Sequence, residues 1–261
     1  AAMSVFKDIC HDRWDLLHRH YRKLCLALGD MDEWSQPLCI HVLTRYARAN
    51  ISKPSDEHVD ADLELLLTSL STLAASMNPA VVIAVVHAYD ALLPERVPMV
   101  FPALLRLLRA SPDVAYLATR SALALARAEK VDMVPVMSSF YVRASDPDYL
   151  ARSKLRVLVC VSPSSHASVL ANELGAYAHA PSIPLALDSV TALGLLARRH
   201  GEVSELCLQL LMDLAQEAAI PTLVLSRAIQ IIKALVRVSS PSMAATIVTR
   251  FCLRLFVPLA R

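Results

Sequence analysis

The histidines and cysteines near the start of the chain are the residues best suited by type to bind a metal ion. They are Cys10, His11, His18, His20 and Cys25. A zinc site needs about four ligands that converge tetrahedrally, usually from paired short spacings. His18 and His20 are two residues apart, so on one helix their side chains would point about 200° apart. We therefore expect a solvated, amphipathic helix face here and no metal site.

The motifs that carry catalysis in many enzymes do not occur in this chain. There is no G-x-S-x-G, G-x-x-x-x-G-K-[ST] or G-x-G-x-x-G sequence, so no nucleophile elbow or phosphate-binding loop is expected. Carboxylates lie close together in sequence in two groups, Asp30, Asp32 and Glu33 in one and Asp146 and Asp148 in the other. Both groups flank expected helix starts, where acidic side chains favour the helix dipole. We predict a non-enzymatic protein without catalytic, cofactor-binding or metal-binding residues; a buried pocket with convergent titratable groups would favour an enzyme instead.

Basic residues form two clusters on expected helices. They are Arg152, Lys154 and Arg156 in one cluster, and Arg198 and Arg199 in the other. Such clusters can dock an acidic partner or anionic lipid headgroups. The alternative that we favour is a solvated face at the helix ends. The net charge of +2, from 26 basic and 24 acidic residues, argues against a dedicated nucleic-acid binder.

A regular recurrence of proline indicates the elements that position these residues. The prolines are Pro79, Pro112, Pro147, Pro184 and Pro221, at intervals of 33, 35, 37 and 37 residues. Proline suits the first turn of a helix, and Asn78, Ser111 and Asp146 directly before three of them are good N-caps. A helix start every ~35 residues is typical of stacked helical pairs. Such an array forms an extended surface for holding partners rather than a pocket.

The apolar spacing predicts an all-α protein with about 12–13 helices. The first two helices are expected at about 13–28 and 34–46, followed by a polar loop or trimmed insert at 50–60. The first helices of the later pairs are expected at 61–76, 95–109, 131–139, 164–179 and 202–217. Their partners are expected at 79–92, 112–128, 147–160, 184–199 and 221–238, with a last helix at about 241–257. Residues 1–261 are expected to form a single helical-repeat fragment.

The composition agrees with a helical core in a reducing compartment. Apolar residues make up 55% of the chain, charged residues 19%, and only four residues are glycine. The mean hydropathy of +0.44 is high, yet no apolar stretch is long enough to span a bilayer. The six cysteines lie far apart without a C-x-x-C pair, as expected of reduced residues in a cytosolic protein. Charge at Lys7 and Asp8 argues against a signal peptide, and helical pattern up to the last residues predicts a piece excised from a longer protein.

Four segments resemble, in the same order, the trunk of the large subunits of clathrin-type adaptors. They are HRHYRKLCLALGDMDEWSQPLCIHVLTRYAR at 18–48, NPAVVIAVVHAY at 78–89, LLRLLRASPDVAYLA at 104–118 and FYVRASDPDYLARSKLRVL at 140–158. The first contains the family's Trp-x-Gln at Trp34 and Gln36 and its Leu-x-x-Tyr ending at Tyr46. The resemblance covers about residues 12–238 and is greatest to the beta subunit of adaptor protein complex 3.

This resemblance implies a fold and a set of partners. The fold would be an α-solenoid of HEAT/armadillo-like helical pairs in a right-handed superhelix. The chain would be a structural subunit of a heterotetrameric vesicle-coat adaptor in the cytosol, associated peripherally with Golgi and endosomal membranes and coated vesicles. Its partners would be a second large subunit, a medium and a small subunit, and an Arf-family GTPase, on a route to lysosomes, vacuoles or lysosome-related organelles. Another helical-repeat scaffold, such as a large subunit of the Golgi retrograde coat or a nuclear transport receptor, is the alternative.

Structural roles follow for single residues. Trp34, Gln36 and Tyr46 are expected to pack one repeat against the next. Asp146 is expected to cap a helix that starts at Pro147, so that its replacement by Ala would cost about 1 kcal/mol. No catalytic or cargo-binding residue is carried over from the family.

Overall fold

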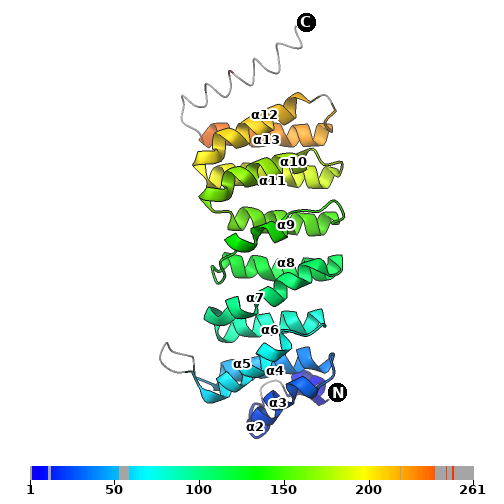
Figure 1. Cartoon of the computed structure of the whole chain (residues 1–261), viewed down its shortest axis with the longest axis vertical. Coiled ribbons are helices and arrows are strands. Elements are labelled where there is room, and N and C mark those ends of the chain that lie inside the picture. Colours follow the sequence, from blue (N-terminus) through cyan, green and yellow to red (C-terminus); the bar gives the residue numbers. More distant parts are fainter. Residues whose placement is uncertain are drawn as a thin grey trace. The chain divides into compact units, whose positions relative to one another are not determined.

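The chain is helical wherever its structure is defined. The computed structural model describes residues 2–10, 13–52, 59–217 and 219–238, together with residues 245 and 249. Within these ranges there are thirteen α-helices and six short 3₁₀ helices, and no strand (Figure 1). In the same part of the chain no helix is both long enough and apolar enough to cross a membrane. The all-α prediction is confirmed, and the helices form two compact units, residues 1–132 and 133–261.

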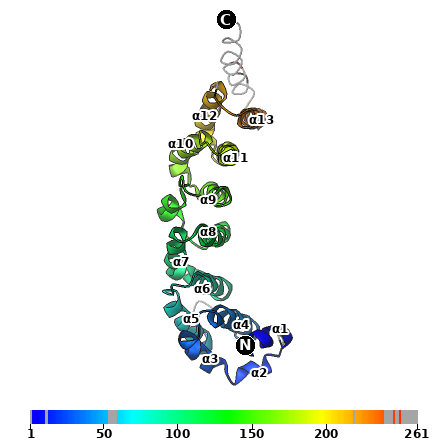
Figure 2. The ribbon, with the colours of Figure 1, turned by 90° about the vertical axis from the view of Figure 1, so that its right-hand side faces the viewer.

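The first unit stacks its helices in two rows. Its α-helices are α1 (Ala2–Ile9), α2 (Asp15–His18), α3 (Tyr21–Ala27), α4 (Ser35–Asn50), α5 (Ala61–Leu73), α6 (Pro79–Leu92), α7 (Val97–Arg106) and α8 (Pro112–Arg127). Its 3₁₀ helices are η1 (Leu28–Asp30), η2 (Pro94–Arg96) and η3 (Leu107–Arg109). The helix α6 packs against α4, α5, α7 and α8, while α3 packs against α5. Seen end-on, α4, α6 and α8 form one row, and α3, α5 and α7 form the other (Figure 2).

The second unit repeats the same arrangement. Its elements are η4 (Val134–Phe140), α9 (Asp148–Val161), η5 (Ser164–His166), α10 (Ala167–Ala178), α11 (Ile183–Arg199), η6 (Gly201–Val203), α12 (Ser204–Gln216) and α13 (Thr222–Val238). The helix α11 packs between α9 and α13, and it also contacts α10 and α12. The row of α9, α11 and α13 therefore lies beside the row that contains α10 and α12 (Figure 2). We call α4, α6, α8, α9, α11 and α13 the second helices, because each is the second member of its pair.

Burial explains why some second helices are apolar almost all round. In α6, the residues Val81, Val82, Val85, Val86, Ala88 and Tyr89 are all buried. A helix with a single buried face would bury only one stripe of such residues. Because α6 has neighbours in its own row and in the other row, most of its circumference is covered. The core of each unit is thus continuous from one helical pair to the next.

Helix boundaries predicted from the recurring prolines are more accurate than those predicted from apolar spacing alone. The second helices that start near a recurring proline begin and end within one residue of the predicted bounds. The helix predicted at 13–28 is instead broken into α2 and α3 around the polar residues Arg19 and His20. The polar loop predicted at 50–60 falls largely on residues 53–58, which lie outside the described residues, and Asn50 is still the last residue of α4. The helix predicted at 241–257 also falls on residues that the structure does not describe, apart from positions 245 and 249.

The α-helix predicted at 131–139 is wrong. This segment forms the 3₁₀ helix η4 at Val134–Phe140. Pro135 lies at its start and lacks a backbone N–H, and Ser138 and Ser139 have hydroxyls that compete for backbone hydrogen bonds. Few residues remain that favour an α-helix, and the segment closes as the tighter helix that short connectors often use.

The caps predicted before the prolines are only partly present. Asn78 caps α6, since its Oδ1 accepts a hydrogen bond from the backbone N–H of Ala80 at 2.9 Å. Ser111 occupies the N-cap position of α8 but makes no side-chain cap bond. The prediction for Asp146 is wrong, because Pro147 occupies the N-cap position of α9 and no side chain caps that helix.

Asp146 instead neutralises a buried ammonium group. Its Oδ2 accepts hydrogen bonds from the backbone N–H of Arg143 at 2.9 Å and from Nζ of Lys154 at 2.5 Å. The side chains of Lys154 and Asp146 are only 1% and 9% exposed. A buried charge is strongly unfavourable unless it is paired. The carboxylate is therefore turned toward α9 by the need to pair Lys154.

A glycine permits a close contact between α11 and α13. A Cβ atom added to Gly194 would lie 2.5 Å from Cγ2 of Ile231, closer than real Cβ contacts allow. Glycine in a helix interior costs about 1 kcal/mol relative to alanine. Here that cost permits the backbone of α11 to pack directly on an isoleucine side chain of α13.

Replacement of Asp146 by Ala should destabilise the second unit far more than loss of a cap would. The Lys154 ammonium would remain buried without a counter-charge, so we expect the free energy of unfolding to fall by about 3–5 kcal/mol. Urea denaturation followed by circular dichroism measures this change. The matched control is D146A/K154M, which removes both charges and should recover most of the loss. A cost of about 1 kcal/mol or less for D146A would contradict the buried pair.

Replacement of Gly194 by Ala should destabilise the chain through one contact. Overpacking lowers the free energy of unfolding by about 1–3 kcal/mol. The higher helix propensity of alanine raises it by up to about 1 kcal/mol. In an I231A background the clash is absent, so the same substitution should be stabilising there. A double-mutant cycle on thermal unfolding measures the difference, with G201A as a control because no atom lies within 4 Å of its added Cβ. An equal effect of G194A in both backgrounds would show that Ile231 is not the constraint.

Candidate interaction surface

The histidines and cysteines near the start of the chain do not converge in space. His18 lies in α2 and His20 is exposed between α2 and α3. Cys25 is buried in α3, whereas Cys10 is half-buried after α1. His11 lies outside the described residues. Over the ranges that the structure describes, no group of three or more His, Cys, Asp or Glu side chains is arranged to hold a metal ion.

The ring of His18 belongs to an aromatic cluster instead. Its Nδ1 lies 2.5 Å from Oη of Tyr46. Tyr46 stacks on Tyr21 with 4.6 Å between ring centroids, and Trp14 meets it edge-on at 6.1 Å. Burial raises the pKa of Tyr21, as expected of a phenol in an apolar environment. The rings from α2, α3 and α4 thus meet at Tyr46 within the first helical pair, and its predicted packing of one repeat against the next stays a prediction.

Gln36 and Trp34 have opposite surroundings. Gln36 is buried, and its Nε2 donates hydrogen bonds to the carbonyl oxygens of Leu28 at 3.1 Å and Met31 at 3.2 Å. These bonds tie α4 to the segment before it within one helical pair, and the predicted packing of one repeat against the next stays a prediction. Trp34 is 88% exposed, so the packing role predicted for it is wrong. Trp34 precedes the first turn of α4, and its side chain there lies largely in solvent.

The paired carboxylates serve separate local contacts. Oδ2 of Asp32 accepts a hydrogen bond from the backbone N–H of Ser35 at 3.0 Å, at the start of α4. Hydrogen bonding by Ser35 lowers the pKa of the Asp32 carboxyl. Asp148 accepts a hydrogen bond from the Ser182 hydroxyl at 2.7 Å, whereas Asp146 pairs with Lys154. These carboxylates do not share a site, and the arrangement offers no general acid and base.

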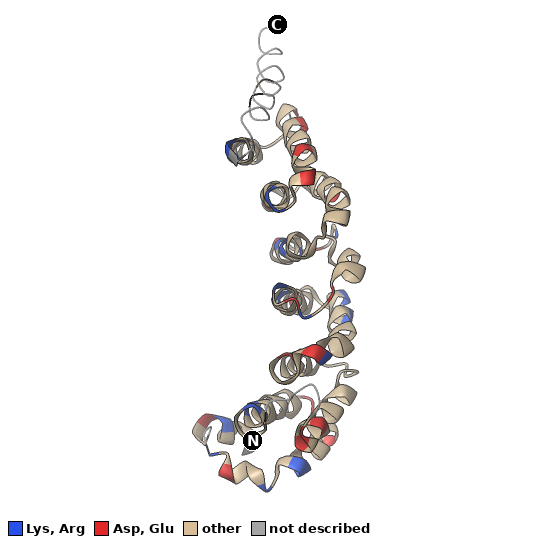
Figure 3. Cartoon of the chain, turned by 90° about the vertical axis from the view of Figure 1, so that its left-hand side faces the viewer, with Lys and Arg blue, Asp and Glu red and all other residues tan. Residues whose placement is uncertain are grey.

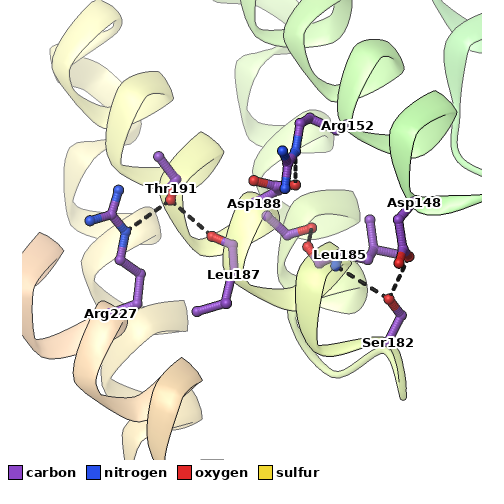
Figure 4. Close-up of polar contacts among 9 residues, drawn as sticks. Asp148, Arg152, Ser182, Leu185, Leu187, Asp188, Thr191 and Arg227 are labelled. Atoms are coloured by element: carbon purple, nitrogen blue, oxygen red, sulfur yellow. Dashed lines mark hydrogen bonds and ion pairs between the residues drawn. The ribbon is translucent and has the colours of Figure 1, made fainter.

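Polar contacts join each second helix of the second unit to the next (Figure 4). Nε of Arg152 on α9 donates to Oδ2 of Asp188 on α11 at 2.7 Å. Nε of Arg227 on α13 donates to Oγ1 of Thr191 on α11 at 3.1 Å. Both pairs are 36 residues apart in sequence. Because exposed pairs of this kind contribute about 0–1 kcal/mol each, they fix the register of neighbouring helices more than they stabilise them.

The helix ends are tied in the same way. Oγ of Ser182 accepts a hydrogen bond from the backbone N–H of Leu185 at 3.4 Å, which caps α11, and donates to Asp148 of α9 (Figure 4). Nη1 of Arg199 donates to the carbonyl oxygen of Val159 at 3.0 Å and to the next carbonyl, at the end of α9. One of the predicted basic residues therefore satisfies backbone acceptors of the neighbouring helix.

The two predicted basic clusters are not uniform surface patches. Lys154 is buried, so it cannot belong to a docking surface. Arg152 and Arg199 are engaged by neighbouring helices. Arg156 and Arg198 remain exposed on α9 and α11. Of these five residues, Arg156 and Arg198 are thus exposed without such a contact to a neighbouring helix.

Charge is segregated between the two rows of helices in the second unit. Every Lys and Arg in residues 147–238 lies on a second helix: Arg152, Lys154, Arg156, Arg198, Arg199, Arg227, Lys233 and Arg237. Of the acidic residues in this range, Glu173, Glu202, Glu205, Asp213 and Glu217 lie on or beside the other row. Only Asp148 and Asp188 lie on second helices. In the second unit, Figure 3 shows most basic residues on the helices seen end-on and most acidic residues along the opposite row.

The contribution of α13 to this basic side was missed from the sequence. Arg227, Lys233 and Arg237 were not recognised as a continuation of the two earlier clusters. The available signal was their spacing, since residues 157–197 and 200–226 contain no Lys or Arg. In the second unit, basic residues thus recur on each second helix, at about the same interval as the prolines.

The thiols should react in an order set by burial. Burial raises the pKa of the Cys25 thiol to about 12 and those of Cys39 and Cys207 to about 11. Thiolate, the reactive form, is therefore scarce at these three sites near pH 8. We expect N-ethylmaleimide to label Cys10 and Cys160 first, as measured by peptide mass spectrometry in native buffer. Labelling at all five positions in denaturant is the control, and equally fast native labelling of Cys25 would contradict its burial.

Comparison with known proteins relates this geometry to a family. Residues 1–255 match the family described as the adaptin N-terminal region. The AP-3 complex subunit beta-1 of Canis lupus familiaris is 31% identical over 238 residues, covering 80% of this chain and 22% of that protein. The AP-3 complex subunit beta of Dictyostelium discoideum is 27% identical over 288 residues, covering 92% of this chain and 26% of that protein. This chain thus spans only about a quarter or less of these curated relatives.

A structural comparison supports the same fold. One chain of the homology model of the full-length AP-3 complex in an intermediate open conformation superposes with a TM-score of 0.66 and 22% sequence identity. The match covers 94% of this chain and 44% of that chain. The helical-repeat architecture predicted from the spacing of the prolines is therefore shared with that chain. Together with the sequence match over residues 1–255, this shows that the chain belongs to the adaptin N-terminal region family.

Proposed function

We propose that this chain is part of the trunk of an AP-3-type beta subunit and acts as a non-enzymatic structural scaffold in vesicle transport. The observation that carries the proposal is the adaptin match over residues 1–255. The similarity to AP-3 beta subunits from Canis lupus familiaris and Dictyostelium discoideum supports the subtype. Residues 1–261 would act as one helical-repeat fragment of that trunk, with the segment at 50–60 as a polar loop or trimmed insert.

The proposed partners are the other subunits of a heterotetrameric adaptor. They are a second large subunit, a medium subunit and a small subunit, with an Arf-family GTPase as recruiter. Stacked helical pairs support this role, because they present long rows of exposed helix to a partner rather than one enclosed site. The complex would associate peripherally with Golgi and endosomal membranes and with coated vesicles, and would direct cargo to lysosomes, vacuoles or lysosome-related organelles.

The alternative helical-repeat scaffolds are less well supported. A large subunit of the Golgi retrograde coat or a nuclear transport receptor would also be built from stacked helices. The family match and the beta-subunit relatives favour the adaptor instead. The segment at 140–158 adds to this preference, since its Asp146 to Lys154 spacing now has a structural reason in the buried ion pair.

Affinity purification of the full-length parent protein from its own cells tests the proposal. We expect mass spectrometry to recover one other large subunit, one medium subunit and one small subunit in amounts comparable to the bait. An unrelated helical-repeat protein from the same cells is the matched control. Recovery of import cargo or of a seven-member coat would overturn the adaptor function while leaving the fold unchanged.

A further inference from the structure

Four cations on the second helices of the second unit are exposed and have no hydrogen-bond or ion-pair partner among the described residues. They are Arg156 of α9, Arg198 of α11, and Lys233 and Arg237 of α13. Leu195 of α11 is 51% exposed among them. We call these five residues the basic face. Their charges are left uncompensated on a side of the unit from which most acidic residues are absent.

Helix dipoles do not account for this distribution. A cation in the last turn of a helix is favoured by the dipole, and α11 and α13 do end in basic residues. The same argument would place cations at the ends of α10 and α12, yet neither helix has a basic residue in its last turn. Arg156 and Lys233 also lie more than one turn before the ends of their helices. The unequal distribution of basic residues between the two rows is therefore a property of the surface and is not explained by the dipoles of individual helices.

The register of the second helices brings the four cations together. The contacts that join neighbouring second helices are 36 to 40 residues apart in sequence. By this offset Arg156 is level with the part of α11 that exposes Leu195. Arg198 is likewise level with the part of α13 that carries Arg237, and Lys233 lies one turn before it. The basic face thus crosses three adjacent helices, with an apolar side chain on the middle one.

We propose that the basic face binds an acidic polypeptide segment that runs in extended form across α9, α11 and α13. Neighbouring packed helices are about 8–10 Å apart, and an extended chain rises about 3.3 Å per residue. A carboxylate at about every third position would therefore meet each helix in turn, with an apolar residue placed against Leu195. Arginine suits such a ligand because its planar guanidinium can pair with both oxygens of a carboxylate. The proposal stands on charge and geometry and does not depend on the adaptor function.

An extended peptide fits these observations better than a membrane surface. Leu195 projects from the body of α11 rather than from a protruding loop, so it is poorly placed to enter a bilayer. Asp148 and Asp188 lie on the same row of helices, so an anionic surface that covered the whole row would also cover these two carboxylates. A narrow polypeptide can cross the cations and avoid both carboxylates. It also supplies the apolar contact that lipid headgroups lack.

The test uses the 261-residue chain and a fluorescent peptide with Glu at every third position and Leu among the intervening residues. Fluorescence anisotropy measures its affinity at low and moderate salt. We expect R156E/R198E/K233E to weaken binding at least tenfold, because attraction becomes repulsion at three points. The matched control, R19E/K23E/R109E, makes the same change in net charge at exposed positions in the first unit and should change affinity less than twofold. A peptide with Gln in place of Glu should not bind, and circular dichroism confirms that both variants fold.

Three outcomes would overturn the proposal. Equal weakening by both triple variants would mean that only net charge matters. If the peptide does not bind, but vesicles rich in phosphatidylserine bind and R156E/R198E/K233E weakens their binding more than the control variant does, the basic face is a membrane contact. If the peptide does not bind, but the chain self-associates in a salt-sensitive way and R156E/R198E/K233E abolishes this, the ligand is a second copy of the chain. Its acidic residues on α10 and α12 would then meet the basic face.

Discussion

The whole structure depends on burying the second helices on several sides. A helix such as α6 is too apolar to face water, so it requires a neighbour in its own row as well as in the other row. Within each unit, each helical pair therefore completes the core of the next, and we expect no pair to be stable in isolation. Gly194 shows how close this packing is, because the absence of a Cβ lets α11 rest directly on Ile231 of α13.

Polar residues have two distinct energetic roles in this scaffold. The buried pair of Lys154 and Asp146 is an obligatory interaction, since either charge alone would be strongly unfavourable at that depth. The exposed contacts between neighbouring helices, such as Arg152 with Asp188, contribute little energy but set the register. That register is what aligns exposed residues from separate helices into a surface.

The helical architecture could be predicted from the sequence because its signals are local. Proline and its preceding residue determine where a helix starts, and α6 begins at Pro79 as predicted. Side-chain roles were less predictable because they depend on residues far away in sequence. Asp146 resembles a cap in sequence but is drawn to Lys154, and Trp34 resembles a core residue but has no neighbour to cover it. The basic face could be found only after the register had aligned three helices.

Hydrogen exchange measured helix by helix tests the central claim that burial between neighbours holds this fold together. The account predicts that in the second unit the backbone amides of α11 exchange more slowly than those of α9 and α13, because α11 is packed between them. In the first unit α6 should be the slowest helix for the same reason. Exchange of α11 and α6 at the rates of their neighbours would contradict the account, since each pair would then be stable without the next.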